Sequence, residues 1–364
     1  MEQDLTRKKP GTMNNQSFTS RRRSDALPPP PPHAICEALQ IKEITIEWLA
    51  GDGSDRCYYR LMSPSLDHSL VLMQLSDHDA KALRENGYEW IQIGDILGAN
   101  GIFVPKTVVT MPEYAAIIIE DYGDLMMESV AKTSLADGLL QDALSLYKDS
   151  FDILVNFLKI QGNAEAPWCR RRFDSERFQW ELNFFRKEFL EPVAGIQLSA
   201  NELATFQEET ITLSDFLAQY SNYFVHRDFH SRNIMVEGKK LAVIDFQDAR
   251  YGPAAYDLVS LCYDSYVPFN NESRLHLLEE GIKSIEEYDP NLGKEIRTHW
   301  KPTLLQRQIK AIGSFGYLSI KKNRGDYLKY VRPALQTLME SSVFDARWPF
   351  LSSELLKRID RSMG

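Results

Sequence analysis

Two short segments, 226–233 (HRDFHSRN) and 243–248 (VIDFQD), contain the residues whose types and spacing best fit a chemical reaction. They place a carboxylate at Asp228, an amide at Asn233 and a second carboxylate at Asp245. Phosphoryl transfer from ATP needs a carboxylate beside the attacking hydroxyl and hard oxygen ligands for Mg²⁺. We therefore expect Asp228 to orient an acceptor hydroxyl and accept its proton. Asn233 and Asp245 would hold Mg²⁺ against the ATP phosphates.

The other polar residues in and after these segments have less specific interpretations. We expect His226 to pack and to hydrogen-bond the backbone, and Asp257 to anchor the loop backbone from the following helix. His230 and Arg232 lie inside the loop, where they could approach a phosphate or the substrate, or could equally be solvated. Asp248 could support metal or substrate binding from a second layer of residues.

A glycine-containing turn precedes this loop in the chain and joins two expected strands. The turn is Gly51-Asp52-Gly53-Ser54, and turns of this kind can point backbone N–H groups at phosphate oxygens. Further on, the stretch 119–123 ends a strand where two lobes should join. Backbone groups near Glu120 and Tyr122 would there hydrogen-bond the edge of the adenine.

The third expected strand lacks the Lys that kinases usually place there to grip the α- and β-phosphates. Met73 or Gln74 occupies that position. Another cation could replace the missing Lys, although each candidate could as well be a surface residue: Arg56, Arg60 or Lys106. This gap is the main argument in the sequence for a degraded kinase that only binds nucleotide.

The composition is that of a globular protein large enough for two lobes. The chain has 364 residues, of which 43% are hydrophobic and 26% charged, with a formal charge of −9. A general nucleic-acid binder would normally carry a basic face, so we expect no nucleic-acid partner. No stretch approaches the roughly 20 apolar residues of a membrane span, and the polar N-terminus does not resemble a secretory signal. We therefore expect a cytoplasmic protein with no membrane partner.

The hydrophobic pattern divides the chain into a tail and two lobes. Residues 1–35, with two basic clusters and a proline run, are expected to be disordered. Residues 36–122 predict a nucleotide-binding lobe with five strands and one helix inserted after the third strand. Residues 123–364 predict a mostly helical lobe for catalysis and substrate binding, with a β-rich stretch at 234–244. The predicted fold class is α+β, a two-lobed protein-kinase-like fold with a five-stranded antiparallel sheet.

Several blocks of the sequence resemble one superfamily. HRDFHSRN followed by VIDF resembles the HxDxxxxN and IDF motifs of the aminoglycoside phosphotransferase/choline kinase superfamily. Protein kinases fit less well, because HRDLKxxN, DFG and APE are replaced or missing. GDGSDRCYYRL, IIIEDYGDLMM, WELNFFRKEFL and LQRQIKAIGSFGYL are similar to blocks of the bacterial N-acetylmuramate/N-acetylglucosamine anomeric kinases. The resemblance spans about residues 44–340, and that family also lacks the third-strand Lys, although Gln74 departs from its pattern.

The resemblance implies an ATP- and Mg²⁺-dependent kinase that phosphorylates the C1 hydroxyl of an amino sugar in cell-wall recycling. It also implies that polar side chains on the helices around Asp228 contact the sugar: Glu181, Asn183, Arg307 and Lys310. Arg307 is the best partner for a lactyl carboxylate because its planar fork supports paired hydrogen bonds, although a salt bridge between helices is the alternative. An aminoglycoside, choline or another sugar as acceptor remains open, as do a pseudokinase scaffold and the oligomeric state.

Overall fold

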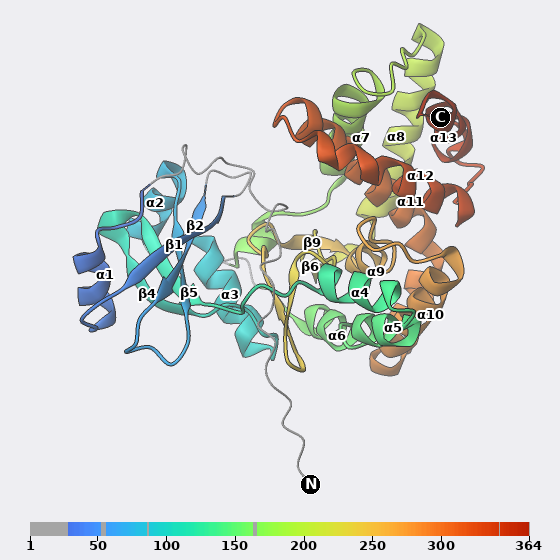
Figure 1. Cartoon of the computed structure of the whole chain (residues 1–364). Helices are drawn as coiled ribbons and strands as arrows, with labels where there is room; N and C mark the ends of the chain where they lie inside the picture. Colours follow the sequence, from blue (N-terminus) through green and yellow to red (C-terminus); the bar gives the residue numbers. More distant parts are fainter. Residues whose placement is uncertain (1–27, 52–55, 86, 163–165, 342, 364) are drawn as a thin grey trace. The chain divides into compact units, whose positions relative to one another are not determined.

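The computed structural model describes residues 28–51, 56–85, 87–162, 166–341 and 343–363 (Figure 1). The chain separates into two compact units. The first contains the described residues of Met1–Asn86 and Thr107–Asp121, and the second those of Gly87–Lys106 and Tyr122–Gly364. Most of the expected tail lies outside the described residues. The first helix, α1 (Pro32–Leu39), begins within its last part.

The first unit is built on one antiparallel sheet of five strands. The strands are β1 (Thr45–Gly51), β2 (Cys57–Met62), β3 (Leu70–Gln74), β4 (Thr107–Met111) and β5 (Ala116–Glu120), in the order β1-β2-β3-β5-β4. Alternate residues of β2 are buried, as the period-two pattern of its sequence predicts. Leu61 of β2, Ile118 of β5 and Ile35 of α1 share one core. The expected five-stranded sheet is confirmed.

The segment after β3, expected as one helix, forms two. These are α2 (Asp77–Arg84) and α3 (Glu89–Ala99). Ser76 caps α2 by accepting a hydrogen bond from the backbone N–H of Asp79, and the backbone is extended again at Tyr88, so a single helix cannot continue. Helix α3 belongs to the second unit, where Trp90 packs on Phe246 with ring centroids 5.0 Å apart.

The second unit is mostly helical and includes two small β ribbons. Its strands are β6 (Ser221–Val225), β7 (Ile234–Glu237), β8 (Lys240–Val243) and β9 (Arg250–Pro253), and β6 pairs with β9 while β7 pairs with β8. The β7–β8 hairpin is the β-rich stretch expected at 234–244. The helices after α3 are α4 (Met127–Ala136), α5 (Leu140–Lys148), α6 (Phe151–Lys159), α7 (Ser175–Phe185), α8 (Ala200–Ala218), α9 (Ala255–Cys262), α10 (Asn271–Tyr288), α11 (Pro290–Ile320), α12 (Val331–Glu340) and α13 (Leu355–Met363).

Helix α11 is the central element of this unit and packs against α7, α9, α10 and α12 (Figure 1). Two glycines allow its close approach to α7 and to the π-helical turn η4 (Arg186–Leu190). A Cβ at Gly313 would lie 2.7 Å from Cα of Phe185, and one at Gly316 would lie 2.3 Å from the carbonyl oxygen of Glu188. A larger residue at Gly313 would therefore push α7 away from α11, and one at Gly316 would push η4 away. Among the described residues, no helix is both long enough and apolar enough for a membrane crossing.

Candidate active site

The loop between β6 and β7 carries Asp228, and a buried carboxylate from α9 holds its first half. One oxygen of Asp257 accepts the backbone N–H of His226 at 2.6 Å, and the other accepts that of Arg227 at 3.0 Å. Arg227 has a φ of 82°, a left-handed conformation that a side chain other than glycine adopts only when its surroundings impose it. The expected anchoring role of Asp257 is confirmed.

A second buried carboxylate, which the sequence reasoning missed, holds the other half of the loop. Asp264 accepts the backbone N–H of Ser231 at 2.9 Å and that of Tyr266 at 2.6 Å, and the Ser231 hydroxyl also donates to it. Asp264 follows Asp257 by seven residues and lies two residues beyond the end of α9. That spacing is the signal in the sequence that could have paired the two anchors.

His226 is a buried, neutral member of the same loop. The backbone N–H of Asp228 donates to its Nδ1 at 3.3 Å, so Nε2 carries the proton and donates to the carbonyl of Ile244 at 2.9 Å. Burial lowers the pKa of His226 to about 4, which keeps the ring uncharged near neutral pH. The ring also packs beside Phe157 and Phe229. The expected structural role of His226 is confirmed.

The carboxylate of Asp228 lies among cations and is 26% exposed. Lys310 Nζ donates to its Oδ1 at 2.7 Å, and Arg227 Nε lies 3.9 Å from its Oδ2. Burial alone would raise the pKa of Asp228, but the charges of Lys310, Arg227 and Arg307 outweigh it and hold the pKa well below its usual range. Asp228 is therefore a fully ionised and weak base.

Asn233 and Asp245 lie beside Asp228, as the sequence spacing predicts. The amide nitrogen of Asn233 donates to the backbone carbonyl of Asp228 at 2.9 Å and lies 3.4 Å from Oδ2 of Asp245. Gln247 donates to the other carboxylate oxygen of Asp245 at 2.7 Å. Asp245 is exposed and has a φ of 64°, a second left-handed residue of the kind that gathers at functional sites.

This donor set fits a hard divalent cation. The amide nitrogen of Asn233 faces the loop backbone, which leaves the amide oxygen as the group that can coordinate, next to a carboxylate. Mg²⁺ is commonly bound by one or two such protein oxygens, with phosphates and water completing the shell. In the described part of the chain no cluster of three or more His, Cys, Asp or Glu forms an alternative metal site.

Asp248 lies among arginines rather than beside Asp245. Its carboxylate is 3.0 Å from Arg227, 3.8 Å from Arg250 and 3.9 Å from Arg171. Arg171 also pairs with Glu89 at the start of α3, at 2.9 Å. Asp248 thus links the loop at 226–233 to β9 and, through Arg171, to α3.

Two of the expected acceptor-binding residues lie on α7 and α11 near this loop. Glu181 is 1% exposed, accepts a hydrogen bond from Gln306 at 2.9 Å and lies 3.7 Å from the guanidinium of Arg227. Arg307 is buried and donates through Nε to the hydroxyl of Ser260 at 3.0 Å. Across the residues that the structure describes, the guanidinium of Arg307 forms no salt bridge, so the alternative of an interhelical ion pair is not observed.

The other three expected acceptor-binding residues, His230, Asn183 and Arg232, have different surroundings. His230 is buried, its ring packs edge-on to Tyr266, and its Nδ1 has no hydrogen-bond partner among the described residues. Burial, and then the charge of Arg307, hold the pKa of His230 well below its usual value, so the ring is neutral. Asn183 donates back to the carbonyl of Gln179 on its own helix at 3.0 Å.

The contacts of Arg232 differ from the sequence-based expectation, which placed this residue near a phosphate, near the substrate or in solvent. Its guanidinium is buried and donates to both carboxylate oxygens of Glu128, at 2.7 and 3.1 Å, and to the hydroxyl of Tyr330 at 2.6 Å. The ring of Tyr266 lies against it, with a centroid 3.8 Å away. Arg232 therefore joins the loop to α4 and to the segment before α12, and these contacts occupy its guanidinium.

Two of the three cations expected near the nucleotide, Arg60 and Arg56, lie in the first unit and are paired. Arg60 donates to both carboxylate oxygens of Asp121, at 2.6 and 3.1 Å, and Ser69 donates to the same carboxylate. Arg56 donates to Asp79 at 3.0 Å.

The remaining residues named in the sequence analysis belong to the third strand and to the expected adenine and phosphate positions. Met73 is fully buried, and Gln74 donates to the backbone carbonyls of Tyr114 and Ala115, so both are structural. Glu120 ends β5, Gly51 ends β1, and Tyr122 is the first residue of its segment in the second unit. Asp52, Gly53 and Ser54 lie outside the described residues.

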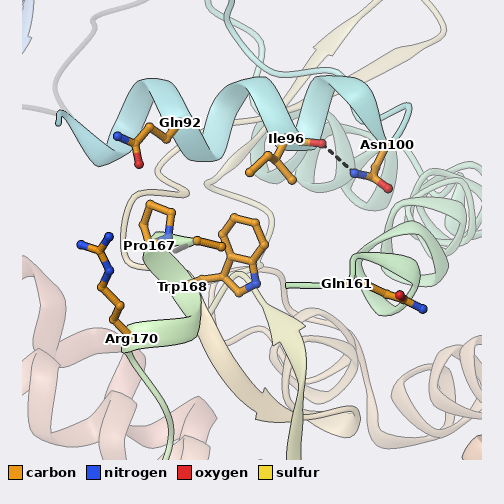
Figure 2. A pocket seen from close by; sticks show the side chains of 8 residues that line it. Gln92, Ile96, Asn100, Gln161, Pro167, Trp168 and Arg170 are labelled. Atoms are coloured by element: carbon orange, nitrogen blue, oxygen red, sulfur yellow. Dashed lines mark hydrogen bonds between the residues drawn. The ribbon is translucent and has the colours of Figure 1, made fainter. Parts of the chain in front are cut away.

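A hollow in the second unit is separate from these residues. It has a volume of about 810 Å³ and lies between α3 and the turn η3 (Pro167–Arg170) (Figure 2). Gln92, Ile96 and Asn100 line it from α3, and Trp168 and Arg170 line it from η3. None of the candidate catalytic, metal or acceptor residues belongs to it.

Comparison with known proteins identifies the family to which the chain belongs. Residues 45–290 match the model of the phosphotransferase enzyme family (APH). The chain is 28% identical over 307 residues to the N-acetylmuramate/N-acetylglucosamine kinase of Pseudomonas aeruginosa, covering 83% of this chain and 84% of that protein. It is 26% identical over 282 residues to the kinase of the same name from Pseudomonas putida, covering 77% and 78%.

A solved structure shows the same fold. The ADP-bound aminoglycoside phosphotransferase APH(2'')-Ib superposes with a TM-score of 0.55 at 16% identity, covering 84% of this chain and 96% of that one. This likeness concerns the fold, and it agrees with the five-stranded sheet and the helical second unit. The family match covers more than half of the chain. The chain therefore belongs to the phosphotransferase enzyme family and is a kinase that phosphorylates an alcohol group.

Proposed function

We propose that this kinase transfers the γ-phosphate of ATP to the anomeric (C1) hydroxyl of N-acetylmuramate, N-acetylglucosamine or both. The observation that carries the proposal is the ionised carboxylate of Asp228, which lies beside Asn233 and Asp245 and is surrounded by cations. Two relatives named for this acceptor pair, each matched over more than three quarters of its length, support the acceptor class. We place the activity in the cytoplasm, where ATP is available.

Asp228 would receive the hydrogen bond of the acceptor hydroxyl and take its proton late in the transfer. The low pKa of Asp228 makes it a weak base, which suits an acceptor that is itself comparatively acidic. An anomeric hydroxyl is more acidic than an ordinary alcohol. In the loose transition state of phosphoryl transfer, orientation and charge neutralisation account for most of the rate, so a weak base is sufficient.

Asn233 and Asp245 would hold Mg²⁺, which would neutralise charge on the ATP phosphates. Asn233 is oriented by the Asp228 carbonyl, which directs its amide nitrogen away from the cation, and Gln247 orients the carboxylate of Asp245. Two protein ligands do not fill the octahedral shell of Mg²⁺, so oxygens of the nucleotide phosphates and water would supply the remaining ligands.

The acceptor would lie on the side of Asp228 that faces α7 and α11. Three buried or half-buried cations, Arg227, Arg307 and Lys310, lie there near the carboxyl groups of Asp228 and Glu181. Arg227 is paired with Asp248, whereas the guanidinium of Arg307 forms no salt bridge among the described residues, so the lactyl carboxylate of N-acetylmuramate would pair with Arg307. The same charges disfavour choline and aminoglycosides, which are cations.

ADP release from the purified protein with ATP and Mg²⁺ tests this proposal across N-acetylmuramate, N-acetylglucosamine, glucose, choline and kanamycin. We expect turnover on an N-acetylated amino sugar and its loss in Asp228→Asn. Turnover on choline or kanamycin alone would keep the kinase and overturn the acceptor. ATP binding with no turnover on any acceptor would instead favour a pseudokinase.

A further inference from the structure

Phosphoryl transfer needs a cation close to the transferred phosphate, and the first unit does not offer the usual one. The third strand carries Met73 and Gln74, whose side chains are buried in the core and bonded to backbone. Arg60 and Arg56, the expected replacements, form ion pairs with Asp121 and Asp79. The third strand therefore supplies no cation of its own, and a side chain elsewhere in the chain would have to take that role.

Lys310 on α11 is a cation fixed beside the reacting atoms. Its Nζ donates to Oδ1 of Asp228 at 2.7 Å, and the residue is 8% exposed. The close packing of α11 on α7 and η4, at Gly313 and Gly316, holds this part of the helix in place. Burial lowers the pKa of Lys310, and the charges of Arg227 and Arg307 lower it further. The negative charge of Asp228 raises this pKa and offsets part of the shift.

The contact with Asp228 places Lys310 within reach of the transferred group. An acceptor hydroxyl that donates to the same oxygen lies about 2.6–3.2 Å from it, and therefore within about 6 Å of Nζ. The γ-phosphorus bonds to that acceptor oxygen, so its equatorial oxygens come close to the ammonium. An ammonium has three N–H donors, and Asp228 takes one of them.

We propose that Lys310 binds the transferred phosphoryl group in the transition state and supplies there the positive charge that kinases usually place on the third strand. The inference rests on the proposed function, because it takes Asp228 as the residue that receives the acceptor proton. In the step, the bond from the γ-phosphorus to the bridging oxygen of ATP breaks and a bond to the acceptor oxygen forms. The acceptor proton moves to Asp228, ADP leaves with the bond electrons, and Lys310 stays protonated throughout.

The test compares Lys310→Met and Lys310→Arg with Lys301→Met, which replaces an exposed Lys on the same helix. Turnover is measured with N-acetylmuramate, which is an acid, with N-acetylglucosamine, which is neutral, and with no sugar, when water is the acceptor. We expect Lys310→Met to lower kcat by about 100–1,000-fold for all three, with acceptor KM values changed by less than about threefold. Lys310→Arg keeps the charge and should keep more of the rate, and Lys301→Met should match the wild type.

The pH dependence separates this role from a purely structural one. Without Lys310, Asp228 loses its closest cation, so the acidic limb of the kcat/KM profile should move to higher pH in Lys310→Met. Thermal unfolding reports whether the variant folds. If Lys310→Met does not fold, Lys310→Arg is the variant that decides. The proposal would be overturned if Lys310→Arg folds and keeps the acidic limb of the wild type, but has a kcat below about one hundredth of the wild-type value.

Two other outcomes would also be decisive. A loss confined to N-acetylmuramate, expressed in KM, would overturn the proposal and assign Lys310 to the lactyl carboxylate. A kcat within about threefold of the wild type on every acceptor would exclude any direct role in transfer. If the wild type phosphorylates neither sugar, the proposed function fails, and ATP hydrolysis to water still tests Lys310 independently.

Discussion

Replacing Asp257 by Asn should damage the catalytic loop although Asp257 touches no reacting atom. The carboxylate accepts two backbone N–H groups, of His226 at 2.6 Å and of Arg227 at 3.0 Å. An Asn side chain has one acceptor oxygen, so its NH₂ group must face the second backbone N–H. Burial raises the pKa of Asp257 to about 7, so above that pH the variant loses one hydrogen bond to a charged group and leaves a buried donor unpaired.

The size of the effect follows from these contacts. A hydrogen bond to a charged group contributes about 1.5–3 kcal/mol, and an unpaired buried donor costs about 1–3 kcal/mol. Allowing for relaxation of the loop, the free energy of unfolding should fall by about 3 kcal/mol, which for a cooperative unit of this size lowers Tm by about 4–6 °C. Arg227, whose φ is 82°, should relax first and shift the adjoining Asp228, and kcat should fall by about 10–100-fold.

Differential scanning calorimetry and ADP release measure both effects. Asp289→Asn is the matched control, because Asp289 also accepts two backbone N–H groups, of Asn291 and Leu292, at the exposed start of α11. Asn is as good a helix cap as Asp, so that variant should keep the wild-type Tm and kcat. The reasoning is refuted if Asp257→Asn leaves both Tm and kcat at the wild-type values.

Three further predictions concern charge, acid stability and packing. Arg307→Met should lower kcat/KM for N-acetylmuramate by about 10–100-fold and leave N-acetylglucosamine nearly unchanged, and equal losses on both sugars would contradict a carboxylate partner. Burial lowers the pKa of both His226 and His299 to about 4, below the value of about 6.5 in the unfolded chain. The histidine contribution to the free energy of unfolding, from urea titrations, should therefore fall as the pH drops from about 6.5 to about 4, by up to about 1.4 kcal/mol per pH unit for each histidine. Asp257, whose pKa burial raises to about 7, contributes with the opposite sign, so the effect is measured as the difference between the wild type and His299→Gln; identical pH profiles for the two would show that the ring of His299 is not held neutral. Gly313→Ala should lower Tm and raise acceptor KM because its Cβ would meet Phe185 backbone at 2.7 Å, whereas Gly98→Ala, with nothing within 4 Å, should not.

Local patterns predicted the parts of this protein whose contacts are near in sequence. The five strands follow from alternating residues and short turns, and the juxtaposition of Asp228, Asn233 and Asp245 follows from a loop that leads directly into the β7–β8 hairpin. The anchoring role of Asp257 was predicted because it follows the loop on the next helix.

Contacts between residues far apart in the chain were not predictable in the same way. Arg232 sits in the loop, yet its partner Glu128 is 104 residues away, and nothing in either segment indicates the pair. Lys310 is 82 residues from Asp228 and was placed only in the general area of the acceptor. The single helix expected after β3 became two because the extended backbone at Tyr88 breaks a pattern that otherwise has helical spacing.

The most direct test of the central proposal is the position of phosphate on the product. ATP, Mg²⁺ and N-acetylmuramate or N-acetylglucosamine are incubated with the wild type and with Asp228→Asn, and the product is examined by ³¹P and ¹H NMR. We predict a phosphorus signal coupled to the anomeric proton in the wild-type reaction, and none with the variant. Phosphate on any other hydroxyl, or the same product from Asp228→Asn, would contradict the proposed function.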